Sequence, residues 1–60
     1  MNEIVKEQIL AVRNTGKTNM LDVHAVQRIA FDMGLYHLVD YIEENQTRYV
    51  AFIFTGTTKL

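Results

Sequence analysis

The sequence predicts an all-α fold: a three-helix mini-domain with a long C-terminal helix, which dimerises. Three observations lead to this prediction. Proline is absent, and three glycines, Gly16, Gly34 and Gly56, divide the chain into three pieces. Within each piece apolar residues recur at helical spacing. The chain has 60 residues and no cysteine, so disulfides and thiolate metal sites cannot support its small core, and association is the remaining support.

The first helix is expected over residues 2–13. Its apolar residues recur on one side of the helix: Ile4, Val5, Ile9 and Val12. Asn2 is suited to cap the start, because its side chain can accept a hydrogen bond from a free backbone N–H. Residues 14–21 are rich in Asn, Thr and Gly and are expected to form a loop. Leu10 falls among polar neighbours, so we expect it at the surface.

The second helix is expected over residues 23–33, with Asp22 as its N-cap and Gly34 as its stop. Its apolar stripe comprises Val23, Val26, Ile29, Ala30 and Met33. Phe31 points away from this stripe. We therefore interpret Phe31 and Leu10 as a surface that faces a partner.

The third helix is expected to begin near Leu35 and to continue to Thr55, so that residues 1–56 form one helical domain and residues 57–60 a frayed tail. Two alternatives stay open. Residues 48–54 are rich in β-branched and aromatic side chains and could form a strand, although the chain offers no second strand to pair with it. Asn45 and Gln46 interrupt the apolar face, either because the helix breaks there or because the amides set the register of a symmetric contact.

The C-terminal half of the third helix is the predicted homodimer interface. Its apolar face is broader than two short neighbouring helices need. The residues expected in the contact are Asn45, Tyr49, Phe52 and Ile53. In a symmetric dimer each chain would present this same surface to its twin.

Two segments are similar to nucleotide- and DNA-binding motifs. Residues 11–18 (AVRNTGKT) are similar to a relaxed P-loop, but a helix precedes them where a P-loop follows a strand. The second and third helices carry part of the apolar skeleton of a helix-turn-helix. The spacing after Gly34 is short for that motif, and three acidic residues in the would-be recognition helix would repel phosphates: Asp40, Glu43 and Glu44.

Catalysis, metal binding and cofactor binding are not indicated. His24 and His37 have no further ligands at regular spacing, and the chain has neither serine nor cysteine for a nucleophile. We therefore expect no enzymatic activity, no cofactor and no metal. The net charge of −1 argues against a nucleic acid or anionic membrane partner. The longest apolar run, residues 49–54, is too short to cross a bilayer, so we expect a cytoplasmic protein.

Several segments carry a resemblance to a known family: residues 16–22, 25–30, 33–34, 38–39, 41–44 and 52–56. On these segments the sequence resembles a family of short proteins from Gram-positive bacteria and their phages and prophages, known only as a domain of unknown function. The resemblance implies a helical mini-protein of mobile-element origin and supplies no activity. We predict a binding or accessory protein, with a host or phage protein as a further candidate partner. The alternatives are a nucleic-acid-associated regulator and an inhibitor that docks on a host protein.

Overall fold

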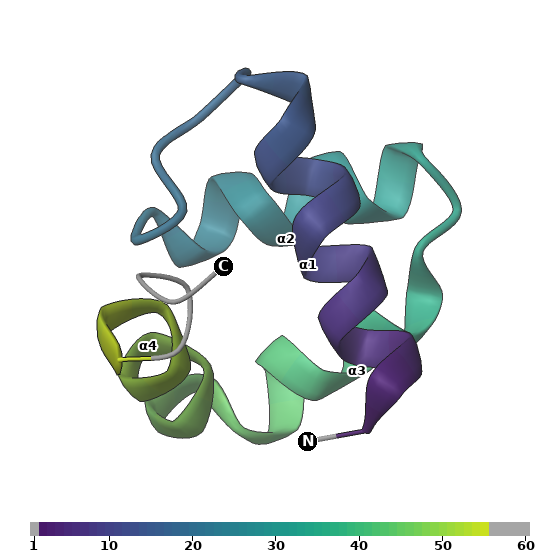
Figure 1. The fold of residues 1–60 in the computed structure, drawn as a ribbon. Helices are drawn as coiled ribbons and strands as arrows, with labels where there is room; N and C mark the ends of the chain where they lie inside the picture. Colours follow the sequence, from purple (N-terminus) through teal and green to yellow (C-terminus); the bar gives the residue numbers. More distant parts are fainter. Residues whose placement is uncertain (1, 56–60) are drawn as a thin grey trace.

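Four helices form within residues 2–55, the part of the chain that the computed structural model describes (Figure 1). They are α1 (Glu3–Thr15), α2 (Val23–Asp32), α3 (Tyr36–Glu44) and α4 (Gln46–Thr55). The all-α prediction is confirmed for these residues, and residues 48–54 are helix, not strand. The prediction of three helices is wrong, because the long C-terminal piece is two helices. The predicted tail, residues 57–60, and the stop at Gly56 lie outside the described residues.

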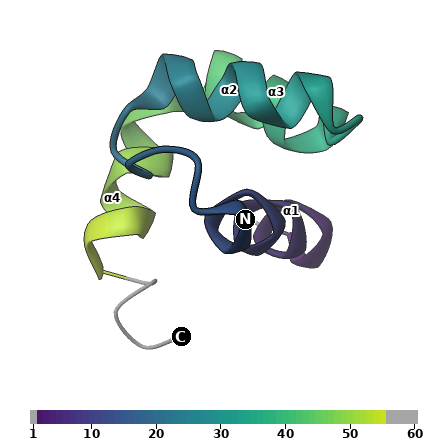
Figure 2. The same cartoon turned by 90° about the horizontal axis from the view of Figure 1, so that it is seen from above.

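The helices are arranged around one core. α2 and α3 lie side by side, α1 packs across both of them, and α4 packs against α3 (Figures 1 and 2). Figure 2 shows α4 turned away from the direction of α2 and α3, so that it closes one end of the bundle. The short connections place consecutive helices next to one another.

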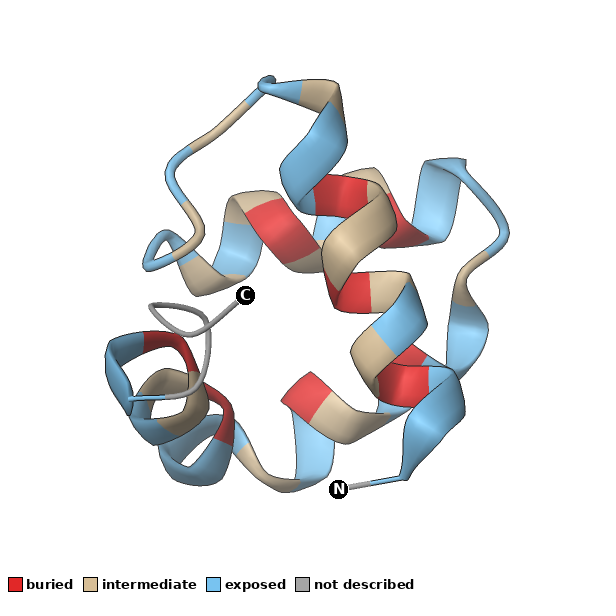
Figure 3. Ribbon diagram, viewed as in Figure 1, coloured by how far each residue is buried: buried red, intermediate tan, exposed pale blue. Residues whose placement is uncertain are grey.

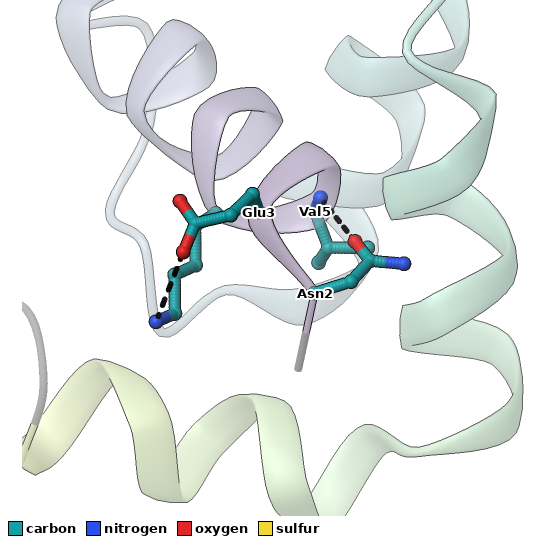
Figure 4. A network of polar contacts seen from close by, with 4 residues as sticks. Asn2, Glu3 and Val5 are labelled. Carbon is teal, nitrogen blue, oxygen red and sulfur yellow. Dashed lines mark hydrogen bonds and ion pairs between the residues drawn. The ribbon is translucent and has the colours of Figure 1, made fainter.

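The N-terminus of α1 is capped as predicted. Asn2 is extended, and its Oδ1 accepts a hydrogen bond of 2.9 Å from the Val5 N–H (Figure 4). This bond satisfies one of the four N–H groups that a helix start leaves without a partner. Glu3 and Lys6 form an ion pair of 3.9 Å in the same turn. Because both side chains are exposed, this pair contributes little to stability.

The C-terminus of α1 is closed by Thr15 and Gly16. Gly16 has φ 65°, a conformation that glycine adopts at no steric cost, and its N–H donates to the Arg13 carbonyl. The Thr15 hydroxyl donates to the Val12 carbonyl at 2.7 Å and accepts from the Lys17 N–H at 3.2 Å. One hydroxyl thus satisfies a helix-end carbonyl and also holds the backbone of Lys17 in the following loop.

Asp22 caps the N-terminus of α2, as predicted: its Oδ1 accepts a hydrogen bond from the Ala25 N–H at 3.3 Å. Asn19 in the preceding loop accepts from the Leu21 N–H at 2.9 Å. This bond is the local Asx turn that short amide side chains favour. The loop between α1 and α2 is therefore ordered by its own polar side chains.

α3 is capped by a residue of another helix. The residue at its own N-cap position, Leu35, has no side-chain acceptor. Gln8, on α1, supplies one: its Oε1 accepts from the Leu38 N–H at 2.7 Å, across 30 residues of sequence. This bond fixes the position of α3 along α1.

Gln8→Ala is expected to lower the free energy of unfolding by about 1 kcal/mol, because the Leu38 N–H would lose its acceptor in a partly buried position. Urea unfolding followed by circular dichroism measures this loss. Gln46→Ala, which truncates an exposed glutamine of α4, is the matched control and should change stability by less than about 0.5 kcal/mol. Equal effects of the two substitutions would contradict the capping role of Gln8.

The break between α3 and α4 falls at Asn45. Its backbone is not helical (φ −138°, ψ 46°), and its N–H donates to the Tyr41 carbonyl while its own carbonyl accepts from the Tyr49 N–H. Asn45 therefore ends α3 and begins α4, which is a typical position for asparagine. Of the two alternatives left open by the sequence, a break in the helix is the one that the structure adopts. The turn directs Tyr49 and Ile53 back into the bundle.

The core consists of nine buried apolar side chains from all four helices (Figure 3). They are Val5, Ile9, Val12, Val26, Ala30, Leu38, Ile42, Tyr49 and Ile53. Ile29, which belongs to the predicted stripe of the second helix, is only partly buried and packs against the edge of this core. Ile4 and Met33 belong to the predicted stripes, but both side chains are exposed.

Candidate binding surface

Three large apolar side chains stand in solvent around the turn between α2 and α3. Phe31 is 59% exposed, Met33 41% and Tyr36 55%. The rings of Phe31 and Tyr36 meet edge to face, with centroids 5.6 Å apart and an interplanar angle of 61°. We refer to Phe31, Met33 and Tyr36 as the aromatic corner. An exposed apolar group of this kind is typical of a surface that another molecule covers.

The backbone of the turn creates this exposure. Gly34 has φ 76°, its N–H donates to the Phe31 carbonyl at 3.1 Å, and the Leu35 N–H donates to the Ala30 carbonyl at 2.8 Å. These two bonds form the Schellman motif, which requires a residue in the left-handed region at the position of Gly34. The motif turns Leu35 toward the core, while Met33 and Tyr36, on either side of Gly34 and Leu35, stay outside.

The two helices that carry the corner are tied together by Gln27. Its Nε2 donates to the Val39 carbonyl at 3.1 Å and to Glu43 Oε2 at 2.9 Å. Both amide protons are therefore used between α2 and α3. The aromatic corner sits on a connection held by these bonds and by the Schellman motif, so its side chains are presented in a defined arrangement.

Charged side chains of both signs surround the corner. Arg28 precedes Phe31 by one turn of α2, and Asp32 follows it directly. Asp40 lies one turn after Tyr36 on α3. All three are exposed, and the only ion pair within residues 2–55 is the one between Glu3 and Lys6. These charges are thus available to an approaching partner.

Two of the residues predicted for the dimer interface lie in the chain's own core. Tyr49 is 0% exposed and Ile53 is 8% exposed. Phe52 is partly buried and packs against the core, and Asn45 is partly buried at the break between α3 and α4. The sequence interpretation assigned this face to a second chain because it assumed one straight helix. The turn at Asn45 instead lets α4 cover the chain's own core.

Tyr49 also fixes the loop between α1 and α2. Its hydroxyl donates to the Met20 carbonyl at 2.7 Å, across 29 residues of sequence. Burial raises the pKa of the Tyr49 hydroxyl to about 12, because desolvation disfavours the charged phenolate. The side chain therefore combines the largest fully buried volume in the described core with a hydrogen bond that joins two elements.

Tyr49→Phe is expected to make the free energy of unfolding fall less steeply at alkaline pH than it does in the parent. The unfolded chain releases this proton near pH 10 and the folded chain near pH 12, so the unfolded state binds fewer protons between these values. The free energy of unfolding of the parent should therefore fall as the pH rises from 10 to 12, by about 2–3 kcal/mol. Urea unfolding at several pH values measures both curves. Parallel curves for parent and variant would contradict this role of Tyr49.

The other predicted surface residues divide between exposed and partly buried. Phe31 is exposed, as expected, whereas Leu10 is partly buried. Met33 and Tyr36 were not predicted as surface residues with a role. Gly34 gave only a partial signal for them: a glycine stop favours a Schellman motif, in which the residue after the glycine, here Leu35, packs back against the helix.

The remaining motifs are not assembled into sites. Lys17 is exposed in a loop, and α2 begins only at Val23, so residues 11–18 do not open a helix as a P-loop does. α2 and α3 are joined by three residues, as in a helix-turn-helix, but α3 exposes Asp40, Glu43 and Glu44.

In the part of the chain that the structure describes, no cluster of three metal-ligand side chains and no pocket occurs. No helix among residues 2–55 has both the length and the apolar character that a membrane span requires.

The comparisons with known proteins identify a family but no function. No curated protein and no solved structure matches the chain. The model of a family described as a domain of unknown function (DUF5049) matches residues 1–57, which is nearly the whole chain. The expected resemblance to an uncharacterised family is thereby confirmed. The chain belongs to the DUF5049 family.

Proposed function

We propose that this protein is a non-catalytic protein-binding module and that the aromatic corner is its docking surface. The observation that carries the proposal is the grouping of Phe31, Met33 and Tyr36 at one turn, each between 41% and 59% exposed. Aromatic residues and methionine are enriched at the centres of protein interfaces, and the rigid aromatic side chains bury much area at a small cost in conformational entropy. The charged residues around the corner suit the polar rim of such an interface.

A protein partner fits this surface better than nucleic acid does. The corner has one basic residue beside it, Arg28, and two acidic residues, Asp32 and Asp40. Nucleic acid partners require a concentration of positive charge. The acidic residues exposed on α3 and the net charge of −1 therefore favour a protein partner over a nucleic acid. We also propose that the module is cytoplasmic and of phage or prophage origin. The origin is supported by the resemblance to short phage and prophage proteins described above.

Site-specific photo-cross-linking in cells tests the proposal. A benzoylphenylalanine in place of Phe31, or of Tyr36, should form covalent products with whatever covers the corner. The matched control is the same substitution at Phe54, a phenylalanine of almost equal exposure, 63% against 59%. Phe54 belongs to the end of α4, which lies on the opposite side of the molecule from the α2–α3 turn (Figures 1 and 2).

The expected result is a discrete cross-linked product from positions 31 and 36 that is absent, or at least tenfold weaker, at position 54. Equal products at all three positions would mean that the reagent reports exposure alone, and the proposal would fail. A product from position 54 only would assign the docking surface to α4 instead.

A further inference from the structure

We infer that the molecule covering the aromatic corner is a second copy of this chain, packed about a two-fold axis that crosses the exposed face of α2 between Arg28 and Asp32, beside Phe31. The inference rests on the proposed function, since it names the partner of that same surface. It differs from an interface on α4, because Tyr49 and Ile53 are already buried in their own chain.

The size of the core favours a partner that is always present. Nine side chains are buried within residues 2–55, and the sequence has no cysteine that could add a disulfide. Domains this small commonly need a further source of stability, and oligomerisation is one of the few available to a chain without cysteine. A second copy is present wherever the first is synthesised, whereas a foreign partner is not.

The charges beside the corner are complementary to themselves. Arg28 and Asp32 are four residues apart on α2, both are exposed, and they lie on the side of the helix next to Phe31. In a two-fold contact the same surface faces itself in the reverse direction, so that Arg28 of one copy approaches Asp32 of the other, twice. The low net charge of −1 per chain adds little repulsion between copies.

The aromatic corner is also preorganised for such a contact. The edge-to-face pair of Phe31 and Tyr36 holds both rings in a defined geometry, and Gln27 ties α2 to α3. A surface that is already ordered loses little conformational entropy when it is buried. Two copies would place four aromatic rings and two methionines at the centre of the contact.

Two charge reversals test the two-fold contact. Arg28→Glu makes both positions beside the corner acidic, and Asp32→Arg makes both basic. In sedimentation experiments each variant alone should self-associate about tenfold more weakly than the parent, because like charges would meet twice. An equimolar mixture of the two variants should recover association, because each acidic copy can then pair with a basic one. Circular dichroism of each variant checks that these exposed substitutions leave the helices intact.

Arg48→Glu is the matched control: it reverses an exposed arginine on α4 and gives the same net charge as Arg28→Glu. It should leave association unchanged. A parent that stays monomeric up to several hundred micromolar, a mixture that associates no better than its components, or an equal effect of Arg48→Glu would each overturn the two-fold contact. Cross-linking from position 31 to a foreign protein, with no product at twice the chain mass, would overturn the dimer and leave the proposed function standing.

Discussion

Tyr49→Ala is expected to remove most of the free energy of unfolding of this domain. Tyr49 is the largest fully buried side chain among the described residues, and its hydroxyl holds the Met20 carbonyl. Truncating a buried aromatic residue to alanine costs about 3–5 kcal/mol. A domain of this length has roughly 3–9 kcal/mol in total. Far-UV circular dichroism and thermal unfolding should show reduced helix content and a strongly lowered or absent melting transition.

The matched control for this substitution is Tyr36→Ala, which truncates a tyrosine that is 55% exposed. Measured at a low concentration, where the chain is monomeric, it should cost no more than about 1 kcal/mol, most of which reflects the lost contact with Phe31. If Tyr49→Ala melted within a few degrees of the parent while Tyr36→Ala melted much lower, the assignment of Tyr49 to the core and of Tyr36 to the surface would be reversed.

Leu38→Ala is the second substitution with a large expected effect. Leu38 is fully buried where α3 meets α1, and its own backbone N–H donates to Gln8. The loss of free energy of unfolding should be about 2–5 kcal/mol, with the larger value if the cavity stays open. Leu21→Ala, at an exposed leucine of the α1–α2 loop, should cost about 0.5 kcal/mol or less. Urea unfolding of both variants measures the difference, and similar midpoints would refute the packing described for α3.

Features that depend on neighbouring residues could be predicted from the sequence. Asn2 and Asp22 accept hydrogen bonds from N–H groups three residues later, and Gly34 permits a left-handed turn that few other residues adopt. Each of these signals acts within one helical turn, so the residue type and its position in the pattern are sufficient to identify it. The starts of α1 and α2 and the stop after α2 were therefore predictable.

Features that depend on distant residues could not be predicted in the same way. Gln8 and Tyr49 find their partners 30 and 29 residues away, and no local pattern indicates such a pair. The break at Asn45 was visible as a polar interruption, but the helical spacing of apolar residues continues on both sides of it. Whether a helix breaks at such a residue depends on how much apolar surface the turn lets the chain bury, which is a property of the whole fold.

The exposure of the aromatic corner follows from the same limitation. Met33 has the spacing of a core residue of α2, but the Schellman motif ends the helix before that position can reach the core. Phe31 was recognisable as exposed because its position opposes the apolar stripe. The binding surface was thus partly visible in the sequence, and its second half became evident only when the turn brought Tyr36 beside Phe31.

The central claim is that α4 covers the chain's own core while the α2–α3 corner remains free to bind. The most direct test is the relaxation of aromatic ring protons by a soluble paramagnetic agent, measured by NMR at low and high protein concentration. At low concentration the Tyr49 ring should be protected, and the rings of Phe31, Tyr36 and Phe54 should relax strongly. At high concentration Phe31 and Tyr36 should become protected while Phe54 does not change. Strong relaxation of Tyr49 at low concentration, or protection that develops at Phe54 instead of Phe31, would contradict the claim.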